Sequence, residues 1–162
     1  MVLLRYLYVV ALVIWVGGLV VAGAVVAPSV FGVLQAWNEV QGRVLAGQVF
    51  GAVLQRLTWL SYAMAALMFV TLTLHRLLGA RPEKYGIRAS ILVLMLLVTA
   101  YSGFRVTPRI GALQGEVNGP IAALADDDAR KVEFSGLHRL ANILLATSAI
   151  GGFVLLWWEA RE

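Results

Sequence analysis

Two absences in this 162-residue chain set the first limits on its function, those of cysteine and of charge. Without cysteine, disulfides, zinc–thiolate sites, iron–sulfur clusters and thiol nucleophiles are all excluded. Charged residues make up only 14% of the chain, whereas a soluble domain carries about 25%. An ordinary soluble domain is therefore excluded as well. The net charge of +4 is interpreted as a consequence of membrane topology, so no nucleic-acid partner is predicted.

What the chain does contain is apolar sequence, with 60% hydrophobic residues and a mean hydropathy of +0.83. A helix needs about 20 apolar residues to cross a bilayer, and four uncharged runs approach or reach that length. They predict one domain over residues 1–162 with spans at about 6–27, 57–76, 88–106 and 138–158. The first run exceeds the apolar core of a signal peptide, which is about 7–15 residues long, so we interpret it as a span. The predicted fold class is all-α, an integral membrane antiparallel four-helix bundle.

Helical extensions are expected on the outer face of this bundle. Apolar periodicity continues through residues 40–56 and 105–115, with a kink expected at Pro108. The run Asp126–Asp128 suits the N-cap and first turn of the last helix, and Asp127 is expected to pair with Lys131. A cation site at these three aspartates is the less favoured alternative.

The loop between the second and third spans predicts the orientation. This loop contains one acidic residue, Glu83, and four basic residues, Arg76, Arg81, Lys84 and Arg88. Short basic loops stay in the cytoplasm. Both termini are then cytoplasmic, and the expected location is the bacterial inner membrane.

Small residues predict close helix packing in lipid. The packing positions expected from this pattern and from the adjoining tryptophan are Trp15, Gly17, Gly18, Ala22, Gly47 and Gly51. We find no internal repeat in the sequence.

Polar residues near the outer ends of three spans form the candidate site. The segment FSGLHRLANILL (134–145) places His138, Arg139 and Asn142 on one helical face, which continues in small residues. We therefore expect this face to point into the bundle and to meet polar groups of the neighbouring spans. The full candidate set is Gln55, Arg56, Tyr101, Arg105, Arg109, Glu133, His138, Arg139 and Asn142. Charges inside a membrane usually mark function, but arginines can also extend to lipid headgroups or pair with Glu133 and Glu116 in a purely structural role.

Other chemistries have less support in the sequence. The two histidines, His75 and His138, fall at opposite ends of predicted spans, so one subunit cannot offer a bis-histidine haem site. Met64, Met68 and Met95 could bind Cu(I), but packing is the favoured interpretation. No catalytic residue, metal site or cofactor is predicted, and enzymatic activity is not favoured.

Four blocks together carry a family resemblance: IWVGGLVVAGAVVAPSVF (14–31), AGQVFG (46–51), YSGFRVTPRI (101–110) and FSGLHRLANILL (134–145). In their order and spacing the chain resembles the transmembrane protein 205-like family, also catalogued as domain of unknown function 4149. The resemblance implies a four-span membrane protein and supplies no activity. A weaker similarity of the WVGG in the first span to copper-resistance membrane domains leaves metal handling open.

Three functions follow as hypotheses. The first is a protein that binds or transports a polar or anionic solute at the outer cluster. The second is a non-catalytic subunit or assembly factor that joins other membrane subunits or further copies of itself. The third is metal or haem handling. The lipid bilayer is the partner common to all three.

Overall fold

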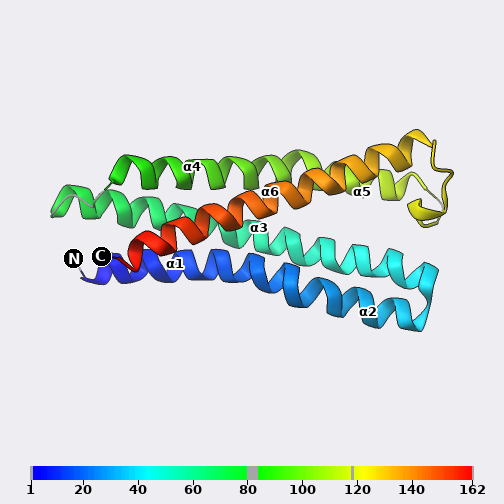
Figure 1. Ribbon diagram of the computed structural model, residues 1–162, viewed down its shortest axis with the longest axis horizontal. Helices are drawn as coiled ribbons and strands as arrows, with labels where there is room; N and C mark the ends of the chain where they lie inside the picture. The colour runs from blue at the N-terminus through cyan, green and yellow to red at the C-terminus, as the bar shows by residue number, and fades with distance from the viewer. Residues whose placement is uncertain (1, 80–83, 118, 162) are drawn as a thin grey trace.

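A computed structural model describes residues 2–79, 84–117 and 119–161, and the tip of the basic loop lies outside these residues. The described chain forms an antiparallel bundle of four long helical segments, with both termini at the same end (Figure 1). In chain order the elements are α1 (Val2–Val21), η1 (Ala22–Val26), α2 (Ala27–Trp37), α3 (Glu39–Leu78), α4 (Tyr85–Tyr101), η2 (Ser102–Val106), α5 (Thr107–Gly115), η3 (Ile121–Ala123) and α6 (Ala129–Glu159). The predicted all-α fold is confirmed.

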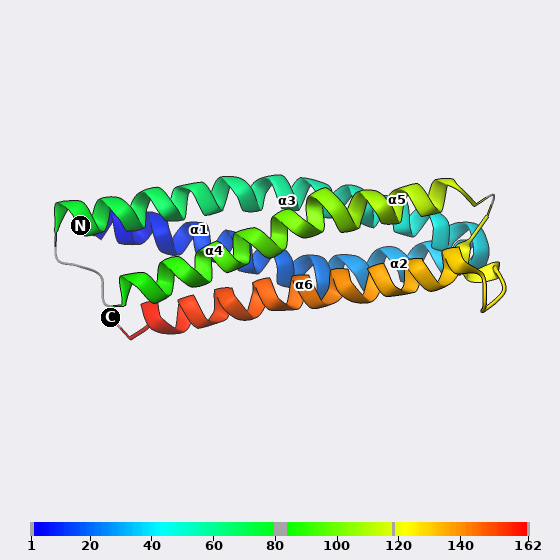
Figure 2. The same ribbon diagram turned by 90° about the horizontal axis from the view of Figure 1, so that it is seen from above.

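Each of the four segments is long and apolar enough to span a membrane. They contain 36, 40, 31 and 31 residues, whereas a span requires only about 20. We call the end of the bundle that holds the termini the inner end and the opposite end the outer end (Figures 1 and 2). The predicted continuation of the helices through residues 40–56 and 105–115 is confirmed, and α3 begins at Glu39, close to the expected start.

Two prolines are accommodated inside helical segments by a wide turn. Proline lacks an N–H and its ring clashes with the carbonyl one turn earlier, yet Pro28 and Pro108 do not end their segments. A five-residue π-helix precedes each proline, and its last N–H bond runs from Ala27 to the carbonyl of Ala22 or from Thr107 to that of Ser102. At the expected irregularity near Pro108 the helix carries an extra residue in the turn before the proline.

Polar side chains cap the first turns of α3 and α6 at the outer end of the bundle. Asn38 caps α3 by accepting bonds from the backbone N–H groups of Val40 (3.1 Å) and Gln41 (2.8 Å). Asp128 caps α6 through the N–H of Arg130 (2.9 Å), as the aspartate run predicted. The expected Asp127–Lys131 pair is wrong. Lys131 instead reaches back to Asp126 (2.7 Å) and to the carbonyl of Leu124 (2.8 Å), which ties the preceding loop to the helix.

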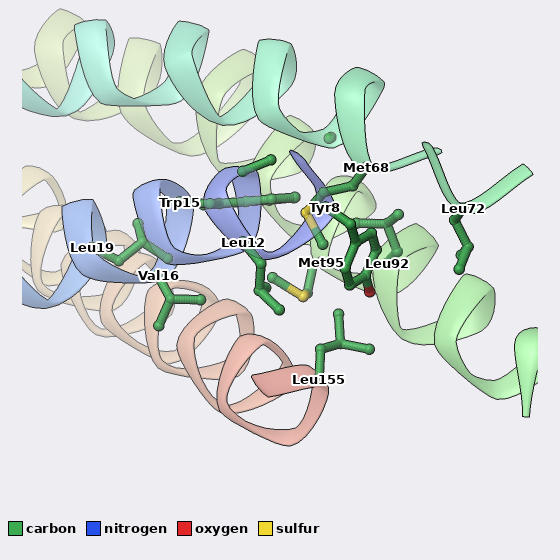
Figure 3. Packing of buried hydrophobic residues seen from close by; sticks show 12 residues of the cluster. Tyr8, Leu12, Trp15, Val16, Leu19, Met68, Leu72, Leu92, Met95 and Leu155 are labelled. Atoms are coloured by element: carbon green, nitrogen blue, oxygen red, sulfur yellow. The ribbon is translucent and has the colours of Figure 1, made fainter. Parts of the chain in front are cut away.

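The core lies in the half of the bundle that contains the termini. Side chains from α1, α3, α4 and α6 point toward one another there, with Trp15 and Met68 fully buried beside Met95 (Figure 3). Close approach depends on glycine, because a Cβ atom at Gly152 would overlap the Val16 side chain and one at Gly18 would lie 2.7 Å from Leu57. Of the other predicted packing positions, Ala22 is buried and Gly47 faces Gln114, whereas Gly17 and Gly51 face open space.

The outer half is packed differently, as two helix pairs that contact each other where Gly47 of α3 faces Gln114 of α5. Figure 1 shows the α2–α3 pair and the α5–α6 pair diverging away from the core. α2 packs on α3, where Phe31 meets Phe50 edge to face at 6.4 Å. No α2 residue is buried. This divergence decides which polar side chains are covered and which are left exposed.

Candidate functional site

The nine residues of the predicted cluster occupy four separate places. Arg109 and Glu133 form an ion pair between α5 and α6, whereas His138, Arg139 and Asn142 line a groove on another face of α6. Gln55 and Arg56 are exposed on α3, and Tyr101 and Arg105 are exposed on the α4–η2 segment. The expected single site is therefore not formed.

Arg109 is neutralised by carboxylates. Its Nε and Nη2 donate to the two carboxylate oxygens of Glu133 at 2.6 and 2.8 Å, and its Nη1 donates to Glu116 at 3.3 Å. This bidentate geometry is the strongest that an arginine and a carboxylate can form. It joins α5 to α6 at the outer end, and we interpret this part of the predicted cluster as structural.

Arg139 has a different environment. It lies with His138 and Asn142 in a wide, open groove of about 530 Å³ along one face of α6, and this helix alone supplies the lining residues. Ser135 completes the polar lining, while Ile143 and Ala146 form the apolar part nearer the membrane centre. The ring of His138 is held parallel to Phe134 at 6.1 Å. Among the described residues, Arg139 has no hydrogen-bond or ion-pair partner.

The expectation that these side chains point into the bundle is wrong. His138, Arg139 and Asn142 are all exposed, although Gly152, farther along α6, is buried against Val16 of α1. The cause is the divergence of the two helix pairs, because the chain that covers α6 at Gly152 turns away toward α3 in the outer half.

Tyr101, Arg105 and Arg109 recur at four-residue intervals across the π-helix η2, and all three are exposed. Their surroundings nevertheless differ. Arg109 reaches Glu133, whereas Arg105 is exposed without a partner among the described residues.

The unpartnered arginines lie at similar depths. At a rise of about 1.5 Å per residue, Arg56 is about 30 Å along α3 from Arg76. Arg139 is about 30 Å along α6 from Glu159, and Arg105 about 26 Å from Arg88. A hydrocarbon core is about 30 Å thick, so a bilayer with one boundary at Arg76, Arg88 and Glu159 would have its other boundary near these three arginines.

A buried ionic network at the inner end was not predicted. Glu159 accepts bonds from Arg88 on α4 and from Arg5 on α1 (3.1 Å), and Arg5 also donates to the Glu159 carbonyl at 2.7 Å. Arg88 and Glu159 are only 4% and 8% exposed. Thr71 and His75 of α3 share with them a cavity of about 10 Å³, about the size of one water. The sequence signal was available: charges of opposite sign stand at the inner ends of three spans.

Comparison with family models gives one match. Residues 10–118 match DUF4149, a domain of unknown function, and this segment runs from within α1 to the loop that follows α5. Comparison with curated proteins and with solved structures finds no match. The narrower name, transmembrane protein 205-like, stays a resemblance. Because the matched segment spans more than half of the chain, this membrane-type helical protein belongs to the DUF4149 family.

Proposed function

We propose that this protein binds an anionic amphiphile, such as an acidic phospholipid, in the α6 groove at the outer boundary of the membrane. The observation that carries the proposal is Arg139, an arginine at membrane-boundary depth that has no counter-charge among the described residues. A cation near hydrocarbon is costly unless an anion or water compensates it. An anionic headgroup would supply that compensation.

The polarity of the groove fits an amphiphile. Ser135, His138 and Arg139 lie toward the outer end of the groove, and Ile143 and Ala146 lie about 10 Å deeper. A headgroup phosphate would accept bonds from the guanidinium of Arg139, with the Asn142 amide as a further donor. The alkyl chain would continue along the apolar part into the bilayer. No cofactor is required.

Binding is favoured over transport for a steric reason. The groove lies on the outer surface of α6, whereas the space between the helices near the termini is filled by apolar side chains such as Leu12, Met68 and Leu92 (Figure 3). A polar solute would have to displace this core to cross the bundle.

Native mass spectrometry with added phosphatidylglycerol tests the proposal. We expect Arg139→Gln to weaken binding about tenfold or more, because a hydrogen bond to a charged group is lost. Arg43→Gln is the matched control, since Arg43 is also exposed but lies on the extension of α3. Phosphatidylcholine should bind more weakly than phosphatidylglycerol, and inorganic phosphate, which has no alkyl chain, should compete poorly. Unchanged phosphatidylglycerol binding by Arg139→Gln would overturn the proposal.

A membrane partner helix is the second candidate for this face. Asn142 is exposed about 5 Å deeper than Arg139, and amide side chains commonly join helices within lipid. Such an interface would suit a second copy or another subunit. The mass of the protein in mild detergent separates the two functions, because Asn142→Leu should dissociate an oligomer held by this face and should leave a lipid-binding monomer unchanged.

We further propose that the termini and the basic loop are cytoplasmic. The support is the charge of Arg76, Lys84 and Arg88. Because the chain has no native cysteine, single substitutions can report the sidedness directly. In intact cells an impermeant maleimide should label Asp127→Cys, and it should label Lys84→Cys only after permeabilisation. The reverse pattern would invert the orientation.

A further inference from the structure

The two wide turns occur in similar sequence. Residues 22–30 read AGAVVAPSV and residues 102–110 read SGFRVTPRI, with glycine, valine and proline shared at the same three positions. Three further positions are chemically similar: Ala22 with Ser102, Ala27 with Thr107, and Val30 with Ile110. In both segments the π-helix begins at the first of these residues and ends two residues before the proline.

The elements around the two turns also correspond. In each half of the chain, a helix leaves the terminal end of the bundle, passes through the π-turn and its proline, and is followed by one long returning helix (Figure 1). The first half is α1–η1–α2–α3 and the second is α4–η2–α5–α6. This correspondence argues against the prediction that the chain lacks an internal repeat. Because both halves run outward and back in the same sense, they are related by an axis along the membrane normal.

The two returning helices, α3 and α6, carry similar short polar segments. Gln55-Arg56-Leu57 on α3 corresponds to His138-Arg139-Leu140 on α6. In both helices the arginine lies about 30 Å from a charged residue at the inner end. Gln55 and Arg56 are exposed and, like Arg139, have no side-chain partner among the described residues.

We infer that the chain consists of two copies of one half-module, and that the α6 groove has a counterpart on α3, formed by Gln55, Arg56 and Trp59, that binds a second anionic amphiphile in the same leaflet. This inference rests on the proposed function of the α6 groove. On α3, Arg56 supplies the cation and Gln55 the amide donor for a phosphate headgroup.

Aromatic rings provide the apolar part of the α3 site. Trp59, 63% exposed, lies one turn deeper than Arg56. Its ring meets Tyr62 edge to face at 5.7 Å, and Tyr62 stacks on Phe104 of η2 at 6.0 Å. The three rings form a row that begins at Trp59, and aromatic side chains are common where a helix crosses the headgroup region. An alkyl chain would pack along this row in place of the Ile143 and Ala146 surface on α6.

The stoichiometry of bound phosphatidylglycerol tests the inference. By native mass spectrometry the wild-type protein should retain two lipids at saturation, Arg56→Gln one, Arg139→Gln one, and the double variant none. Arg43→Gln should retain two. Thermal unfolding followed by circular dichroism should show unchanged stability, because none of these arginines has a partner among the described residues.

The outcomes separate the two claims. If Arg56→Gln retains as many lipids as the wild type while Arg139→Gln loses one, the α3 site is overturned and the proposed function stands. If neither variant loses a lipid, both claims fail. Replacing Trp59 by alanine provides a second readout, because it should weaken the α3 site selectively and leave the lipid that depends on Arg139 in place.

Discussion

At the scale of single residues, the arginines of this protein differ in their interaction partners. Arg109 and Arg88 are held by carboxylates from a neighbouring helix, whereas Arg56, Arg105 and Arg139 have no partner among the described residues. All five stand at or near the ends of apolar runs, so the sequence alone could not separate structural arginines from candidate ligand-binding ones. The separation depends on which helix lies opposite, and that is a property of the tertiary structure.

The Asp128 cap predicts a local pH dependence. Hydrogen bonds from the Arg130 side chain and backbone lower the pKa of Asp128 from 3.8 to about 2. A carboxylate with a lowered pKa stabilises the folded state above its unfolded pKa and loses that contribution as pH falls through its folded pKa. Amide protection in the first turn of α6 should therefore be constant above about pH 5 and should decrease from about pH 4 to pH 2. Hydrogen exchange provides the measurement.

Asp127 offers a matched comparison for this prediction. It is exposed and does not cap the helix, so Asp127→Asn should preserve the acid-dependent loss, whereas Asp128→Asn should remove most of its pH dependence. Equal profiles for these two variants would contradict the assignment of the transition to the cap.

At the scale of elements, helix lengths and directions followed from the sequence, but local helix geometry did not. Uncharged runs and continuing periodicity predicted the long helices because each needs only an apolar face and few breakers. The π-turns escaped prediction because the period of an α-helix was assumed to continue through Ser102–Val106. Proline marked the position of the irregularity, yet it could not predict a widened turn.

The connection from α2 to α3 depends on one glycine. A Cβ atom at Gly42 would overlap the Leu34 carbonyl oxygen, and backbone at this position cannot move without disturbing the Asn38 cap. We expect Gly42→Ala to destabilise the protein by about 1–3 kcal/mol, as overpacked sites do, seen as a lower Tm in detergent. Gly51→Ala on the same helix meets nothing within 4 Å and should be neutral or slightly stabilising. A similar decrease in Tm for both variants would contradict the proposed close approach.

At the scale of the whole molecule, the two ends are held together by different means. The outer end relies on exposed ion pairs such as Arg109–Glu133, whose side chains are 45% and 42% exposed. The inner end has the apolar core and the buried ionic network around Glu159. Two cation–π contacts flank this network: the Arg76 guanidinium lies 4.4 Å from the centre of the Tyr85 ring, and the Arg161 guanidinium lies 4.3 Å from that of Trp157. The sequence did not predict the ionic network, because pairing across 154 residues is set by topology. Stability should therefore be concentrated at the inner end, while the outer helix pairs remain the freer part.

Replacing one glutamate at each end tests this asymmetry. Glu159→Gln removes the carboxylate that accepts bonds from Arg88 and Arg5, in a site where Arg88 is 4% exposed, and breaking a buried ion pair typically costs about 3–5 kcal/mol. Glu133→Gln breaks an exposed pair, for which about 0–1 kcal/mol is typical. Denaturant or thermal unfolding in detergent should therefore show a much larger loss for Glu159→Gln. A double-mutant cycle with Arg88→Met adds a second check, because removing the arginine should cost less once Glu159 has been replaced. If the two glutamate variants are equally stable, or if the cycle shows no coupling, the inner network does not hold the bundle together.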